Sequence, residues 1–150
     1  MSEKIAIASD HAGLELKLYL ISILEEMGFE PVNLGTDTED SVDYPDFGIL
    51  LSGEVSSGTI ERGILVCGTG IGMSIVANKF KGVRAALVSD VFTARMAKEH
   101  NNANVLVIGG RIVGKTLAEE MVRSWVGAEF LAGRHQRRLD KITKIEEGCK

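Results

Sequence analysis

Short, largely apolar runs alternate along the chain with longer segments whose apolar residues recur every three or four positions. Runs of the first kind are typical of buried strands, and segments of the second kind are typical of helices that bury one face. The segment 14–27 shows the helical spacing clearly, and Gly28 follows it. Glycine readily adopts the left-handed conformation with which many helices end, so we expect this helix to end there.

The same pattern divides the whole chain into five strands and six helices. The sequence predicts strands at residues 4–9, 29–34, 63–67, 83–88 and 105–108. It predicts helices at residues 14–27, 43–56, 71–80, 91–100, 115–126 and 134–147. Strands that alternate with helices form right-handed crossovers, which give a parallel sheet with helices on both faces. We therefore expect an α/β fold with a five-stranded parallel sheet and a single domain over residues 1–150.

Ligands of such sheets bind beyond the carboxyl ends of the strands. The residues expected at those ends are 10–11, 67–70, 89–90 and 109–111. They include an acid beside a histidine, a cysteine before a glycine-rich turn, and an arginine after two glycines. These segments are therefore the first place to look for chemistry.

The glycine-rich turn CGTGIG occupies residues 67–72. Between an apolar strand and a helix, such a turn directs backbone N–H groups toward an anion. A dinucleotide-binding fingerprint is a competing interpretation, and Asp90 lies about where its ribose-binding acid would be. That fingerprint needs a third glycine where this chain has Met73, so the match fails there. A tight turn without a ligand would also account for one or two of the glycines.

Cys67 brings reactive chemistry to this turn. Its place at a strand end, just before a helix begins, favours the thiolate, which can abstract a proton or act as a nucleophile. An isolated cysteine is more often a small buried apolar residue. The adjacent anion-binding turn favours the functional interpretation.

Two histidines also occupy informative places. His11 follows Asp10 at the end of the first strand; a capping role for Asp10 would leave His11 unexplained. His100 ends a helix before the fifth strand, where the helix C-terminus by itself favours a cationic ring. Both histidines are candidates for catalysis or anion binding.

A basic segment, GRHQRR at 133–138, stands out in an acidic chain. Arg134 and Arg138 share one helix face a turn apart, where like charges repel unless an anion lies between them. Arginine pairs suit a phosphate group. We expect Arg111 to add a third positive charge; a solvated helix end is the alternative.

Composition narrows the possible functions. The net charge of -4 and the pI of about 5.4 argue against nucleic acid and anionic membranes as partners. No apolar run reaches membrane-spanning length and no signal peptide is visible, so we expect a cytoplasmic protein. The two cysteines, Cys67 and Cys149, are expected to be free thiols. The three histidines lack metal-ligand spacing, so no metal site is expected.

These features together predict proton transfer on a small anionic substrate, without a metal or a cofactor. A hydrolase triad fits less well, because it would need no separate phosphate clamp. A non-catalytic module that binds a nucleotide or a sugar phosphate would explain the turn and the arginines. It would leave Cys67 and His100 without a role.

Five segments closely resemble the ribose-5-phosphate isomerase B family, whose wider group includes galactose-6-phosphate isomerase subunits. They are SDHAG at 9–13, DYPD at 43–46, CGTGIGMSIVANKFKGVRAAL at 67–87, EHNNANVLVIGGR at 99–111 and GRHQRRLDKI at 133–142. The resemblance runs over essentially the whole chain. It implies a Rossmann-like α/β/α sandwich and a homodimer, sometimes paired into a tetramer, whose active sites contain residues of both subunits. The helix at about 134–147 is then expected to pack at the dimer interface.

The resemblance also implies roles for individual residues. Cys67 matches the catalytic base, Thr69 a hydroxyl that holds the reacting oxygens, and His100 the ring-opening group, which the neighbouring subunit contributes with help from Asp10. The expected substrate- and phosphate-binding residues are His11, Tyr44, Gly68, Gly70, Ile71, Gly72, Asn101, Arg111, Arg134 and Arg138. The reaction so implied converts D-ribose 5-phosphate and D-ribulose 5-phosphate through a cis-enediolate. A six-carbon sugar phosphate, such as allose or galactose 6-phosphate, is the alternative substrate.

Overall fold

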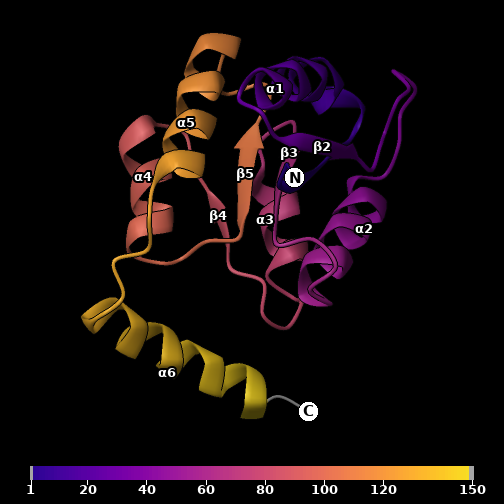
Figure 1. Ribbon diagram of the computed structural model, residues 1–150. Helices are drawn as coiled ribbons and strands as arrows, with labels where there is room; N and C mark the ends of the chain where they lie inside the picture. Colours follow the sequence, from indigo (N-terminus) through magenta and orange to yellow (C-terminus); the bar gives the residue numbers. More distant parts are fainter. Residues whose placement is uncertain (1, 149–150) are drawn as a thin grey trace.

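Five parallel strands form the centre of the structure, a computed structural model that describes residues 2–148 (Figure 1). The strands are β1 (Lys4–Ser9), β2 (Glu30–Asn33), β3 (Arg62–Cys67), β4 (Ala85–Leu87) and β5 (Val105–Gly109). Their order across the sheet is β2-β1-β3-β5-β4, and every neighbouring pair is parallel. The predicted five-stranded parallel sheet is confirmed.

Helices cover both faces of this sheet, as its apolar strands require. They are α1 (Leu14–Glu26), α2 (Tyr44–Ser56), α3 (Ile71–Ala77), α4 (Val91–Glu99), α5 (Lys115–Gly127) and α6 (Arg134–Gly148), with a short 3-10 helix, η1, at His11–Gly13. Ile5 and Ile7 of β1 pack with α1, α4 and α5, whereas Ala6 and Ala8 belong to the core under α2 and α3. The expected α/β/α sandwich is confirmed. None of the helices in the described part of the chain is long and apolar enough to cross a membrane.

Several element ends differ from the sequence prediction, and Asn78 explains one of them. Helix α3 ends at Ala77 instead of reaching residue 80. The Asn78 side chain donates to the Ser74 carbonyl (3.1 Å) and to the Ala85 carbonyl (3.0 Å), and it accepts from the Ala85 amide (2.9 Å). One side chain thus ends the helix and fixes the start of β4. A periodic pattern contains no sign of such a link.

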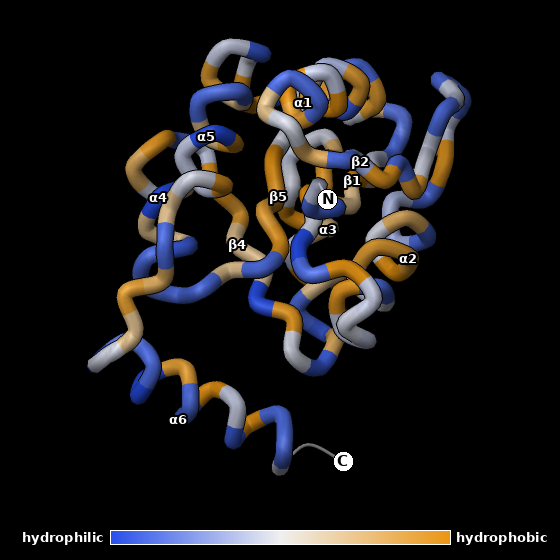
Figure 2. The backbone as a smooth tube through the Cα atoms, in the orientation of Figure 1, coloured by the Kyte–Doolittle hydropathy of each residue, from blue (hydrophilic) through white to orange (hydrophobic). Residues whose placement is uncertain are grey.

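Helix α6 lies apart from these layers, beyond the amino ends of the strands (Figure 1). Hydrophobic and hydrophilic residues alternate along it in Figure 2. Ile142 and Ile145 are 49% and 66% exposed, and they line a cavity of about 390 Å³ between α6 and the sheet. The apolar side of α6 is therefore only partly covered by its own chain.

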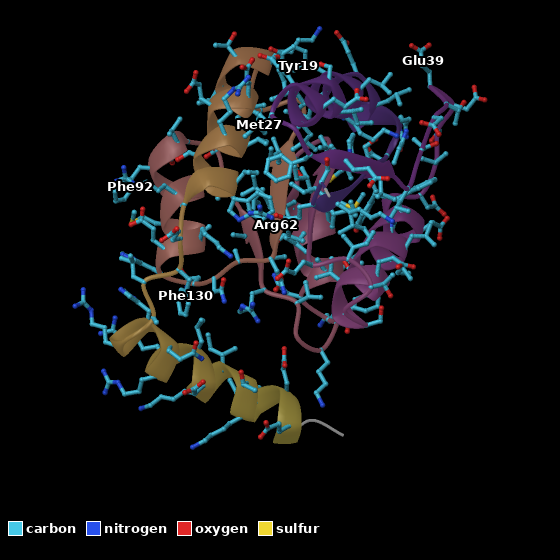
Figure 3. All side chains as sticks on the ribbon, viewed as in Figure 1. Tyr19, Met27, Glu39, Arg62, Phe92 and Phe130 are labelled. Carbon is cyan, nitrogen blue, oxygen red and sulfur yellow. The ribbon has the colours of Figure 1, made fainter. Side chains whose placement is uncertain are left out.

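Trp125 anchors α5 in the core. Its side chain is fully buried, and its indole N–H donates to the Ala103 carbonyl at 3.1 Å. The guanidinium of Arg62, labelled in Figure 3, lies 5.6 Å from the centroids of the Trp125 and Phe29 rings and donates two hydrogen bonds to Glu3. This arrangement joins α5 to the amino edge of the sheet.

Replacing Trp125 should be costly even when the new residue is aromatic. Trp125→Phe leaves the buried Ala103 carbonyl without its donor, so we expect a loss of about 1–3 kcal/mol in the free energy of unfolding. Urea denaturation at a fixed protein concentration measures this loss. Leu18→Ala, at a half-exposed position on α1, is the control and should change the free energy by less than about 0.5 kcal/mol.

Candidate active site

Cys67 is the last residue of β3 and its side chain is buried, with 5% of its surface exposed. It is a free thiol; Cys149, the other expected free thiol, lies outside the described residues. Beyond the strand ends, the Gly110 amide donates to the Cys67 carbonyl (2.7 Å) and the Arg111 amide donates to the Gly68 carbonyl (3.0 Å). The pairing of β3 with β5 therefore continues past the sheet and brings Arg111 to the glycine-rich turn.

The turn lies flat on the end of β5, and only glycine permits that fit. Gly70 has a φ of +82°, and a Cβ there would lie 2.5 Å from Leu87 Cδ1. A Cβ on Gly109 would lie 2.6 Å from the Thr69 carbonyl oxygen. The first hydrogen bond of α3 runs from the Ser74 amide to the Gly70 carbonyl, so the amides before Ser74 have no partner within the helix. The turn thus provides the amides that the sequence predicted.

The Thr69 hydroxyl already binds one of these amides. Its hydroxyl oxygen accepts a hydrogen bond from the Ile71 amide at 3.2 Å. The Ile71 amide is therefore engaged, and the proton of the Thr69 hydroxyl is available to donate outward. A cavity of about 260 Å³ opens beside Thr69 and Ile71, between the turn and the end of β4.

Tyr44 and Arg111 lie against the two ends of the turn. The Tyr44 ring packs so closely on Gly72 that a Cβ there would lie 2.3 Å from Tyr44 Cε1. Arg111 extends over Gly68, where a Cβ would lie 3.4 Å from Arg111 Nη1. Both side chains are partly in solvent, so a ligand at the turn would meet a phenol and a guanidinium.

Asp10 and His11 complete this edge of the sheet. Asp10 is buried, and its carboxylate accepts from the Gly13 amide at 3.0 Å, so it caps the short helix η1 that leads into α1. His11 Nδ1 accepts from the Val42 amide at 3.1 Å. Because an amide can only donate, Nδ1 is unprotonated and Nε2 carries the proton of the neutral ring. Sequence patterns could not identify Val42 as a partner, because it acts through its backbone.

The remaining predicted residues form a second group at the other edge of the sheet. This group comprises His100, Asn101, Arg134, His135 and Arg138, from the end of α4 and the start of α6. The rings of His100 and His135 are stacked, with centroids 4.2 Å apart and an angle of 12° between their planes. His135, the histidine of the basic segment 133–138, is thus the direct neighbour of His100.

The two groups do not meet within one chain. His100 precedes β5 and Arg111 follows it, so this five-residue strand, about 16 Å long, separates them. Within one chain Arg111 therefore lies away from Arg134 and Arg138, and the prediction that it adds a third charge to them can apply only between two copies of the chain. Parallel strands place everything before a strand at one edge and everything after it at the other.

Comparison of the sequence with known protein families identifies the family of this chain. The sequence model of the ribose/galactose isomerase family matches residues 5–142. The chain belongs to the ribose/galactose isomerase family. Among residues 2–148, no group of three or more His, Cys, Asp or Glu side chains is placed to hold a metal ion.

Relatives within the ribose/galactose isomerase family differ in substrate. Ribose-5-phosphate isomerase B of Escherichia coli is 43% identical over 145 residues, 97% of each chain. D-erythrulose-4-phosphate isomerase of Pectobacterium atrosepticum is 40% identical over 143 residues, 95% of this chain and 94% of the relative. The structure of ribose-5-phosphate isomerase B from Mycoplasma genitalium with bound ribulose 5-phosphate has a TM-score of 0.95 and 44% identity, and the match covers 99% of both chains. This chain is thus similar to isomerases of more than one sugar phosphate.

The buried His135 ring predicts a pH dependence of stability. Burial, and then the positive charges of His100, Arg134 and Arg138, lower the pKa of His135 below its usual value of 6.5. The unfolded chain therefore binds this proton more readily than the folded chain. The stability that the neutral, buried His135 ring gives the folded protein is fully present above the pKa of the unfolded chain. It is lost as the pH falls from that value through the lower pKa of the folded protein. Thermal melts between pH 5 and 8, a range chosen to bracket a histidine pKa, should show a smaller acid loss for His135→Phe than for the parent protein. Equal losses would contradict the assignment.

Proposed function

We propose that this protein interconverts D-ribose 5-phosphate and D-ribulose 5-phosphate in the cytoplasm, with Cys67 as the base and with neither a metal nor a cofactor. The observation that carries the proposal is the meeting of a buried thiol, an amide-bearing turn and Arg111 at the ends of β3 and β5. The ribulose 5-phosphate bound to the Mycoplasma genitalium relative supports the choice of substrate.

The reaction begins with opening of the furanose ring, which His100 of the partner subunit promotes by proton transfer, with Asp10 beside the ring oxygen. The Cys67 thiolate then removes the proton from C2, leaving a cis-enediolate, and returns a proton to C1, while the hydroxyl proton on O2 passes to O1. A positioned acid or base typically contributes about 10²–10⁴-fold in rate. Each step moves a proton and leaves the carbon skeleton intact, so no redox group is needed.

The enediolate oxygens develop negative charge beside the turn. The amides of Gly68, Gly70 and Gly72 and the outward hydroxyl of Thr69 are suited to receive that charge. Removing one such donor in acyl-transfer enzymes costs about 10²–10³-fold in turnover. Because Gly70 and Gly109 fix the turn, these donors are in place before the substrate reacts.

The phosphate takes no part in the reaction, and its role is to bind and orient the substrate. Arg111 and His11 approach it from the Cys67 edge, while Arg134 and Arg138 approach it from the other group; Tyr44 and Asn101 contact the sugar. Binding energy from a group that does not react orients C1 and C2 toward the base. The Nε2 proton of His11 provides a neutral donor alongside the guanidinium groups.

The two groups must come from different copies of the chain, so we propose a homodimer. Its interface includes α6, whose Ile142 and Ile145 are left exposed by their own chain. Such an apolar helix face beside an open cavity is suited to a second copy. In this arrangement the His100 group of one subunit reaches the Cys67 edge of the other. A single domain over residues 1–150 then contributes half of each of two sites.

Subunit complementation tests the base and the shared site together. Cys67→Ala and His100→Asn should each lower turnover of cyclic ribose 5-phosphate by about 100-fold or more. A heterodimer of the two variants contains one intact site and one doubly altered site. Heterodimers purified with two different tags should therefore recover about half of the parent activity.

Two outcomes would contradict the proposal. Near-normal turnover by Cys67→Ala would exclude it as the base. Purified heterodimers no more active than their parents would exclude a site shared between subunits. Binding of ribose 5-phosphate by Cys67→Ala, followed by calorimetry, checks that the variant site is otherwise intact.

Substrate choice requires its own assay. Turnover in excess EDTA should be fastest with ribose 5-phosphate and slower with erythrulose 4-phosphate and allose 6-phosphate. The four-carbon sugar is included because a relative at 40% identity carries that name. A higher kcat/KM for either alternative would reassign the substrate within the same reaction. Absence of turnover, with thermal stabilisation by NAD or AMP, would indicate a binding module instead.

A further inference from the structure

Lys17 is a fully buried cation that the proposed reaction does not use. It lies in the first turns of α1, and its side chain has no exposed surface. Its ammonium donates to the Thr36 carbonyl, to Asn33 Oδ1 at 2.7 Å and to Asp37 Oδ1 at 3.1 Å. All three N–H bonds of the ammonium thus end on oxygens of residues 33–37, which comprise the last residue of β2 and the four residues after it. Burial lowers the pKa of Lys17 below its usual value, and the hydrogen bond and charge of Asp37 offset only part of that lowering.

The acceptors of this ammonium belong to a loop that we define as residues 34–43, together with Asn33 at its start. The Asn33 side chain accepts from the Gly35 amide (3.0 Å) and donates to Asp37 (2.9 Å). The loop also pairs with β1, because Ser9 donates to the Gly35 carbonyl (2.7 Å) and accepts from the Thr36 amide (2.8 Å). Lys17 therefore holds the loop against the strand residue that directly precedes Asp10.

The far end of the same loop supports two side chains of the candidate site. Val42 donates to His11 Nδ1 and so selects the ring form whose Nε2 carries the proton. Tyr44 begins α2 directly after the loop, and its ring packs on Gly72. A shift of residues 34–43 would therefore disturb the donor of His11 and the place of Tyr44 together.

We propose that Lys17 is a positioning residue of the active site, whose ammonium fixes the 34–43 loop so that His11 keeps its proton on Nε2 and Tyr44 stays against the turn. A role in stability alone does not account for it. A buried charge loses its hydration, and apolar residues of similar volume are often as good or better for stability. What an apolar residue cannot do is bond three oxygens in fixed directions. The substrate part of this inference depends on the proposed function, whereas the effect on the loop does not.

Lys17→Met tests the proposal, because methionine keeps much of the volume and removes the donors. In ¹⁵N spectra of the imidazoles, the parent His11 should show an unprotonated Nδ1 and a protonated Nε2, and Lys17→Met should show a mixture of the two forms. With ribose 5-phosphate, KM should rise about tenfold while kcat changes less than about threefold. Leu20→Ala is the matched control: it is a fully buried residue of the same helix in the core under α5. It should lower the melting temperature without changing the His11 spectrum or KM.

Asn33→Ala provides a second route if Lys17→Met does not fold. Asn33 is exposed, and its replacement removes one acceptor of Lys17 and two bonds within the loop. It should shift the His11 spectrum and KM in the same direction, by less. An unchanged His11 spectrum in both variants would overturn the proposal, and so would equal changes in Leu20→Ala. If the parent protein does not turn over ribose 5-phosphate, the proposed function fails, and the His11 spectra still decide the role of Lys17.

Discussion

The hydrogen bond from the Gly110 amide to the Cys67 carbonyl, at 2.7 Å, is the contact on which the candidate site depends. It extends the pairing of two central strands by one step beyond the sheet, and the Arg111 amide adds a second step. Through these two bonds the ends of β3 and β5 become one rigid edge. The proposed base Cys67, the glycine-rich turn and Arg111 are thereby held by backbone, which has little freedom to move.

Close packing then determines which residues this edge can contain. The turn rests on Gly109 and reaches Leu87 at Gly70, so neither position has room for a side chain. Gly72 is required for a different reason, because the Tyr44 ring occupies the place of a Cβ. These three glycines are thus needed mainly because other groups pack against them. Among the three, only Gly70 has a positive φ, which also favours glycine.

Much of this could be predicted from the sequence, and the failures share one cause. The five strands, the helices, the cap at Asp10 and the place of Cys67 at a strand end follow from local patterns of apolar residues and turns. The end of α3 at Asn78, the Val42 amide on His11 and the stack of His135 on His100 do not, because each joins two separate segments, and a local pattern of apolar residues does not show which segments meet. Lys17 is the clearest example of a feature that the sequence does not predict. Its place in a helical pattern gives no sign that it is buried, since the three oxygens that make burial tolerable come from another segment.

The separation of the two groups of site residues follows from the topology itself. In a parallel sheet each covering helix runs opposite to the strands, so its last residues return to the amino edge. His100, at the end of α4, therefore cannot approach Cys67, at the end of β3, without a rearrangement of the fold. Arg134 and Arg138 cannot approach Cys67 of the same chain either, because α6 also lies beyond the amino ends of the strands (Figure 1). On this fold, a reaction that needs both a strand-end thiol and a helix-end histidine requires a second copy of the chain. The second copy must be turned so that its amino edge faces the carboxyl edge of the first. A symmetric pair satisfies that condition twice, and activity then depends on association of the subunits.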